Sequence, residues 1–156
     1  MKFFQSMAVA ANLLASGLAI EIRFHDTNNC IGGYVYCPTI NPNHCCLGPG
    51  SMSTYFAWIP REWSIDTRVF EGKVCSGVSR TQRSGSRDAI CMGAEWELIQ
   101  SARYDFVGKK RGETSDGNTG DEECQKPSGV VFADGAHYQF DAMTESQVVE
   151  MFLIDL

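Results

Sequence analysis

Apolar and polar residues alternate over two short segments of the chain, residues 20–24 and 65–70. The first reads Ile20-Glu21-Ile22-Arg23-Phe24 and the second Ile65-Asp66-Thr67-Arg68-Val69-Phe70. Because successive side chains of a strand point to opposite faces of a sheet, this pattern predicts two strands that each bury one face. Each segment leads into a Cys-x-Gly sequence, at Cys30 to Gly32 and at Cys75 to Gly77, where glycine permits the positive φ of a tight turn. The chain therefore predicts two copies of one β unit.

Short β-rich runs separated by turn residues continue to about residue 92, a pattern typical of an all-β sandwich. The predicted strands include residues 33–37 and 53–59, and residues 38–44 and 81–88 are predicted to be a loop and a polar turn. Trp58 and Trp63 flank Pro60, and we expect both tryptophans to be core anchors.

Further elements are predicted beyond residue 92. Residues 94–104 fit an amphipathic helix by propensity and a strand by alternation, and we favour the strand. Residues 130–140 predict a hairpin, in which Asp134-Gly135 would supply the positive φ values of a type I′ turn. Thr144 to Gln147 is a predicted capping box that begins a helix running to the end. Residues 108–120 read as a flexible loop.

The repeated unit resembles the Greek-key motif of the βγ-crystallin superfamily, which has an aromatic residue, a folded hairpin turn, a glycine seven residues later and a downstream serine. The matching residues are Phe24, Cys30, Gly32 and Ser51 in the first copy, with one residue inserted, and Phe70, Cys75, Gly77 and Ser86 in the second. The resemblance covers about residues 20–92 and implies a Greek-key β-sandwich, stapled by disulfides and followed by a C-terminal hairpin and short helix. Secreted microbial toxins and inhibitors belong to that superfamily, and small cysteine-rich proteins exported by fungi look similar.

Many microbial members of the superfamily bind calcium through an Asx-Asx-x-x-Ser/Thr-Ser stretch. Here Asn28-Asn29 is followed by Gly32-Gly33, which lack the hydroxyl groups. We therefore expect no cofactor, with disulfides in place of calcium as the staple.

The N-terminus predicts export. Residues 1–19 carry Lys2, an apolar stretch at residues 7–15 and the small-residue ending Gly17-Leu18-Ala19, as in a cleaved secretory signal. Residues 20–156 would then be one domain, with residues 93–156 as a C-terminal extension. Loss of Lys2 would leave 12 basic against 19 acidic residues, a net charge of −7, which disfavours nucleic acid as a partner. No later segment is apolar enough to span a membrane.

The seven cysteines suit an oxidising compartment. We expect disulfides from Cys30, Cys37, Cys45, Cys46, Cys75 and Cys91, with Cys124 unpaired. Because neighbours on an extended chain point apart, Cys45 and Cys46 should have different partners, Cys37 for one and Cys91 for the other. Cys30 and Cys75 would be paired together or engaged separately. A zinc site is the alternative, but Cys-x-x-Cys is absent.

The sequence contains no strong catalytic motif. His25, His44 and His137 lie in different segments, and neither Gly-x-Ser-x-Gly nor His-Glu-x-x-His is present. A small secreted ribonuclease needs little more than a Glu, an Arg and one or two His, and Glu95, Glu97, Arg103 and His137 have these types.

Our leading hypothesis is a secreted, non-catalytic binding protein, an effector or toxin-like module directed at a protein or cell-surface target of a host or competing cell. Residues 41–49 and 109–123 would be its contact loops. A small secreted hydrolase such as a ribonuclease is the alternative, and a wall- or matrix-associated structural protein is a third reading.

Overall fold

The computed structural model describes residues 19–108, 124–144, 146–147 and 150. The expected signal segment, except Ala19, lies outside the described residues, as do the expected contact loop 109–123 and most of the C-terminal helix. Among the described residues, no helix is long and apolar enough to cross a membrane.

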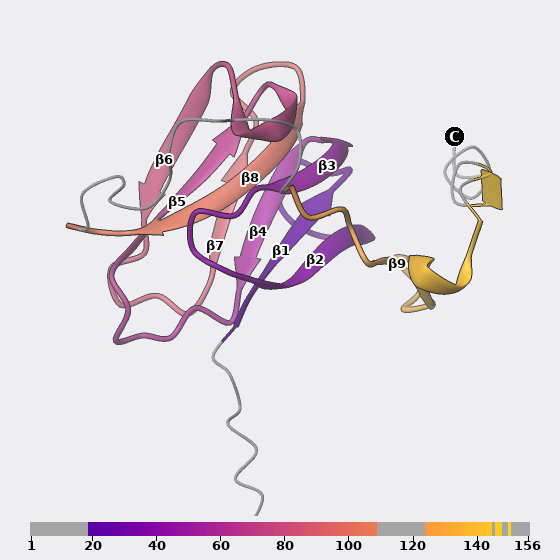
Figure 1. Cartoon of the computed structure of the whole chain (residues 1–156), viewed down its shortest axis with the longest axis horizontal. Coiled ribbons are helices and arrows are strands. Elements are labelled where there is room, and N and C mark those ends of the chain that lie inside the picture. Colours follow the sequence, from indigo (N-terminus) through magenta and orange to yellow (C-terminus); the bar gives the residue numbers. More distant parts are fainter. Residues whose placement is uncertain (1–18, 109–123, 145, 148–149, 151–156) are drawn as a thin grey trace, which may run out of the picture.

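The described chain is all-β, as predicted, and its strands form two antiparallel sheets that pack as a sandwich (Figure 1). The six-stranded sheet has the order β10-β9-β2-β1-β4-β7. Its strands are β10 (His137–Gln139), β9 (Gly129–Val131), β2 (Tyr34–Ile40), β1 (Ile20–His25), β4 (Ser53–Ala57) and β7 (Ile90–Gly93). The four-stranded sheet has the order β3-β8-β5-β6. Its strands are β3 (Cys46–Ser51), β8 (Ile99–Phe106), β5 (Ile65–Phe70) and β6 (Ser79–Arg83).

The alternation in β1 and β5 decides which side chains enter the core. Ile20, Ile22 and Phe24 of β1 are buried, whereas Glu21 and Arg23 between them lie on the opposite face and stay partly exposed. In β5, Ile65, Thr67 and Val69 are buried and Asp66 and Arg68 are partly exposed. The core therefore lies between the two sheets and excludes the charged residues of both strands.

The two halves of the sandwich have the same arrangement. In the first half, β2 and β4 flank β1, and β3 lies in the opposite sheet. In the second half, β6 and β8 flank β5, and β7 lies in the opposite sheet. Each half thus gives its third strand to the sheet of the other half, so neither sheet is complete without both halves.

A serine holds the turn after the first strand in each half. The Ser53 hydroxyl accepts the Cys30 N–H (3.0 Å) and donates to the Thr27 carbonyl (2.5 Å). The Ser101 hydroxyl accepts the Cys75 N–H (2.9 Å) and donates to the Gly72 carbonyl (2.6 Å). The serines expected from the motif, Ser51 and Ser86, do not have this role. The tying serine must lie on the strand beside the turn, and strand pairing decides which one does.

The register also changes the alignment of the two copies. His25 pairs with Ser53, and Phe70 pairs with Ser101, so His25 and not Phe24 is equivalent to Phe70. Gly32 and Gly77 then follow at the same spacing, with φ of +90° and +78°, and no residue is inserted. Cys30 and Cys75 correspond as well, and both have positive φ.

Two strands were not predicted, and both have a composition that disfavours strands. β6 (Ser79–Arg83) falls partly in the expected polar turn, and β3 takes residues 46–49 from the expected contact loop 41–49. β6 is an edge strand that pairs only with β5, and polar residues are typical of an edge. β3 contains Gly48, Pro49 and Gly50, and its pairing with β8 is irregular. Residues 94–104 contain a strand, as favoured, but β8 begins at Ile99 and completes the second half.

Three disulfides join the six cysteines expected to form them: Cys30–Cys91, Cys37–Cys46 and Cys45–Cys75. The adjacent Cys45 and Cys46 have different partners and Cys37 bonds to one of them, as expected. The expectation that Cys91 bonds to the other was wrong. Cys91 lies on β7 beside the first turn, and Cys45 precedes β3 beside the second, so each turn is joined to the third strand of the other half. Cys124 lies outside these three disulfides.

The hairpin predicted at residues 130–140 extends the six-stranded sheet, because β9 pairs with β2 and with β10. Its turn is not type I′, since Gly135 (φ +90°) has positive φ and Asp134 does not. The Gly135 N–H bonds to the Phe132 carbonyl and the Phe132 N–H to the Ala136 carbonyl, as in a longer loop with a bulge. At the expected capping box, the Thr144 N–H donates to Gln147 Oε1 (2.9 Å).

Candidate binding site

The outer face of the six-stranded sheet carries a group of aromatic side chains around one arginine. We call Glu21, Arg23, Tyr34, Tyr55 and Trp58 the Arg23 platform. Arg23 lies at the centre of β1 and pairs with Tyr36 of β2 on one side and with Tyr55 of β4 on the other. Alternation along β1 directs Arg23 away from the core, and the two neighbouring strands supply the rings.

The Arg23 guanidinium lies against three of these rings. Its central carbon is 4.7 Å from the ring centroid of Tyr34 and 5.7 Å from those of Tyr55 and Trp58. Arg23 Nε also bonds to Glu21 Oε1 at 2.5 Å. A cation over ring faces is attracted by their quadrupoles, by roughly 0.5 to 1 kcal/mol at exposed sites. The arginine is therefore held in place by contacts within the protein.

Trp58 is the most exposed member of the platform. Both tryptophans were expected to be core anchors, and for Trp58 this was wrong, because the residue is 67% exposed. Trp63 does pack on the core and contacts Phe106 edge to face. Trp58 has φ of +63°, which is costly for a bulky residue. The next residue, Ile59, is buried, and its N–H bonds to the Asp88 carbonyl at 2.9 Å. This anchoring fixes the backbone that turns the indole outward.

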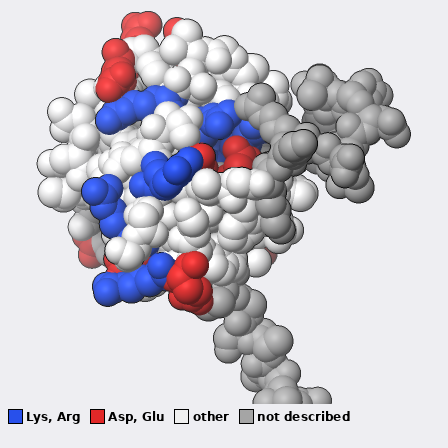
Figure 2. Space-filling view, turned by 90° about the vertical axis from the view of Figure 1, so that its left-hand side faces the viewer, with Lys and Arg blue, Asp and Glu red and all other residues white. Residues whose placement is uncertain are grey.

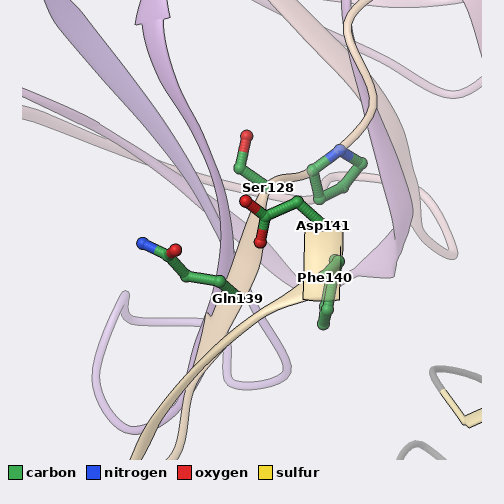
Figure 3. Close-up of a pocket in the computed structure, with 5 residues that line it drawn as sticks. Ser128, Gln139, Phe140 and Asp141 are labelled. Atoms are coloured by element: carbon green, nitrogen blue, oxygen red, sulfur yellow. The ribbon is translucent and has the colours of Figure 1, made fainter. Parts of the chain in front are cut away.

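A second polar group lies where the hairpin joins the same sheet. The Tyr36 hydroxyl is 2.5 Å from His137 Nε2, and burial, followed by the negative charge of Glu21, raises the pKa of Tyr36. Nearby, Pro127, Ser128, Gln139, Phe140 and Asp141 line a shallow cavity of about 400 Å³. Figure 3 shows the Asp141 carboxylate between the side chains of Ser128 and Gln139.

The structure does not bring the predicted ribonuclease residues together. Glu95 and Glu97 lie in the connection between β7 and β8, Arg103 lies on β8 of the four-stranded sheet, and His137 lies on β10 of the other sheet. Glu95 forms an ion pair with Arg80 instead (3.3 Å). Their separation follows from strand order, which the sequence does not reveal.

The other two histidines are also apart. His44 is exposed in the loop before β3. His25 is 3% exposed, its ring lies 5.2 Å from that of Tyr34, and burial, with the Arg23 charge as a lesser cause, lowers its pKa. Among the described residues, no group of three or more His, Cys, Asp or Glu side chains could hold a metal ion.

Sequence reasoning missed the Arg23 platform, although part of its signal was present. The alternation in residues 20–24 directs Glu21 and Arg23 outward, and Tyr34 and Tyr36 have the same spacing. The contribution of Tyr55 depends on the pairing of β1 with β4, and that of Trp58 on an unusual backbone conformation.

Comparison with known protein families finds a match to the family model described as "ARB_05566_N: N-terminal domain", over residues 21–128. No curated protein and no solved structure matches the chain. The matched range runs from β1 to the segment before β9 and so contains both halves of the sandwich and the Arg23 platform. Because it spans more than half of the 156 residues, the chain belongs to the ARB_05566_N N-terminal domain family.

Proposed function

We propose that this protein is a secreted, non-catalytic binding protein, an effector or toxin-like module whose Arg23 platform contacts a protein target on a host or competing cell. The observation that carries the proposal is the position of Arg23 against three aromatic rings, one of which belongs to the outward-turned Trp58.

The chemistry of the platform supports a protein partner. Trp, Tyr and Arg are the residues that most often carry the binding energy of protein interfaces, because they bury a large area and keep a polar group for hydrogen bonding. Arg23 and Glu21 have side chains that are 20% exposed, so part of each remains accessible to a partner. Three disulfides fix the sandwich that carries these residues, which reduces the entropy lost on binding.

A binding experiment with matched variants tests the role of the platform. The chain would be used in a pull-down from candidate target cells, beside Trp58→Ala and a control, Val78→Ala, whose side chain is also exposed but lies beside β6 in the other sheet. We expect Trp58→Ala to weaken capture of the target at least tenfold, since hot-spot truncations cost about 2 kcal/mol or more. Equal capture by the two variants would place the binding surface elsewhere.

An activity assay separates this proposal from the ribonuclease alternative. We expect the protein to leave RNA, ester and glycan substrates uncleaved. If RNA is cleaved and His137→Ala abolishes that cleavage with the fold intact, the protein is a ribonuclease. The Tyr36–His137 contact would then be the part of its site to study first.

We also propose that each half of the sandwich is a Greek-key motif of the βγ-crystallin type. Supporting features are the exchange of β3 and β7 between the halves, the glycine seven residues after His25 and after Phe70, and the serine that ties each turn. An experimental structure that matches a βγ-crystallin domain strand for strand would establish this relationship.

Secretion is likewise part of the proposal and has a direct test. Disulfides and the absence of a membrane-spanning helix among the described residues are compatible with it. N-terminal sequencing of the protein from culture medium is expected to begin near Ile20. Intact protein in the cytosol that retains Met1 would contradict export.

A further inference from the structure

The outer face of the four-stranded sheet carries two arginines side by side. Arg68 of β5 and Arg103 of β8 are direct partners in the antiparallel pairing. The equivalent pair in the first half is Arg23 and Tyr55, so the second half has a second cation where the first has an aromatic ring. Like charges placed opposite each other destabilise a sheet unless something compensates them.

Three other arginines each have a carboxylate of their own. Arg83 bonds to Asp66 through Nε (2.9 Å) and Nη2 (3.4 Å), Arg61 bonds to Asp88 (2.8 Å), and Arg80 lies 3.3 Å from Glu95. Figure 2 shows basic side chains in several groups on the left-hand side of Figure 1, where β5 and β6 lie, with acidic side chains among them.

Arg68 and Arg103, in contrast, share one carboxylate. Asp105 Oδ2 is 4.0 Å from Arg68 Nη2, and Asp105 Oδ1 is 3.6 Å from Arg103 Nε. Both distances are too long for a hydrogen bond. The pair therefore has one positive charge more than its local carboxylate can balance.

The hydrogen bonding of this group is incomplete. Nε of Arg68, Nε of Arg103 and Oδ1 of Asp105 are buried atoms that make no hydrogen bond in the described part of the chain. A buried polar atom without a partner costs about 1 to 3 kcal/mol, and more if it is charged, so such atoms are rare unless a water or ion completes them. The side chains of Arg68 and Arg103 are 20% and 23% exposed, which leaves part of each accessible to solvent.

We propose that the Arg68–Arg103 pair binds a single oxyanion of the sulfate or phosphate class. Guanidinium groups donate to such anions through parallel N–H groups, and here two of them are adjacent. The Arg83–Asp66 pair shows that one guanidinium already satisfies one carboxylate. Two adjacent guanidiniums have more N–H donors than one carboxylate can accept, so they suit an anion with more oxygens. The Arg103 guanidinium carbon lies 5.6 Å from the Phe70 ring centroid, a contact that holds it in place.

The site takes one anionic group rather than a long polyanion, because Arg83, which lies next to this group in the sheet, is already paired with Asp66. A sulfate ester or a phosphate ester on a larger molecule would present the same group. This inference is independent of the Arg23 platform, which lies on the other sheet.

The test titrates the full chain with sodium sulfate, sodium phosphate and sodium acetate at constant ionic strength, with binding followed by calorimetry or NMR. We expect saturable binding of sulfate and phosphate, and binding of acetate at least tenfold weaker. Arg68→Gln and Arg103→Tyr should each weaken sulfate binding at least tenfold. Arg61→Gln removes an exposed arginine that has its own carboxylate, and it should bind sulfate like the unmodified chain.

Arg103→Tyr introduces the residue type that the first half already accommodates at the equivalent position, and each variant's fold is checked by thermal melting. Arg68→Lys is a second variant that keeps the charge but loses the planar guanidinium, and it should bind sulfate with intermediate affinity.

Equal sulfate binding by all variants would mean nonspecific screening, and absence of saturable binding would also overturn the site. Acetate binding as tight as sulfate binding would contradict the assigned anion class. Methyl sulfate and methyl phosphate would then show which ester is preferred.

Discussion

At the scale of single residues, the two copies of the repeat differ most clearly at His25 and Phe70. Both side chains end the first strand of their half and lie opposite the serine that ties the turn. Phe70 suits this buried position, whereas His25 is a titratable group there. Burial and the charge of Arg23 lower the pKa of His25 below its ordinary value of 6.5, so the folded protein binds this proton less readily than the unfolded chain.

This difference predicts a pH-dependent stability. Above pH 6.5, His25 is neutral in the folded and in the unfolded protein, and the folded state keeps its full stability. As the pH falls from 6.5 towards the lower pKa of folded His25, the unfolded chain binds the proton more readily, and the folded state loses stability. His25→Phe should therefore flatten the decline in melting temperature between about pH 7 and pH 5. His44→Phe, at an exposed loop position, serves as the control. An unchanged pH profile in His25→Phe would mean that another group causes the decline.

At the scale of elements, the turns after β1 and β5 depend on hydrogen bonds from a distant strand. The Ser101 hydroxyl accepts a hydrogen bond from the Cys75 N–H and donates one to the Gly72 carbonyl, so both groups of the turn depend on a residue outside it. Ser101 is 26 residues from Cys75, which is why the serine cannot be identified from the turn sequence alone.

Ser101→Ala is therefore expected to lower the free energy of unfolding by about 1 to 3 kcal/mol, because a partly buried N–H and a partly buried carbonyl lose their partner. Ser86→Ala alters the exposed serine that the motif had suggested, and it should change stability by less than about 0.5 kcal/mol. Urea denaturation of both variants measures the difference. Similar losses in the two would mean that Ser101 does not tie the turn.

At the scale of the whole molecule, disulfides connect the two halves in addition to the shared sheets. Cys30–Cys91 runs from the turn of the first half to β7, and Cys45–Cys75 runs from the turn of the second half to the residue before β3. Cys37–Cys46 has no equivalent in the second half and joins β2 to β3, which belong to different sheets. The three bonds together link both sheets and both halves into one unit.

The length of chain that each bond closes predicts its effect. Cys30–Cys91 spans 61 residues and Cys37–Cys46 spans 9. In the chain-entropy model, a disulfide stabilises the folded state by restricting the unfolded chain. Loops of these lengths correspond to roughly 4 and roughly 3 kcal/mol. Replacing both cysteines of Cys30–Cys91 by alanine should therefore lower the midpoint of urea denaturation more than the same change at Cys37–Cys46. The reverse order would show that packing around the buried Cys37 and Cys46 outweighs chain entropy.

The sequence by itself determined the class of fold and the strands with a clear period. Alternation at residues 20–24 and 65–70 identified β1 and β5, and the repeated Cys-x-Gly identified two related turns with glycine at positive φ. Local spacing fixes these features, because the side-chain period of a strand and the conformational freedom of glycine act within a few residues.

Tertiary structure alone decided which distant residues meet. The order and register of strands decide the partner of Cys91 and the serine that ties each turn. They also decide which rings surround Arg23 and that Arg68 pairs with Arg103. β3 and β6 are strands because neighbouring strands pair with them, although their own residues do not favour it. Strand order is set by burying one shared core between two sheets, and that requirement involves the whole chain at once.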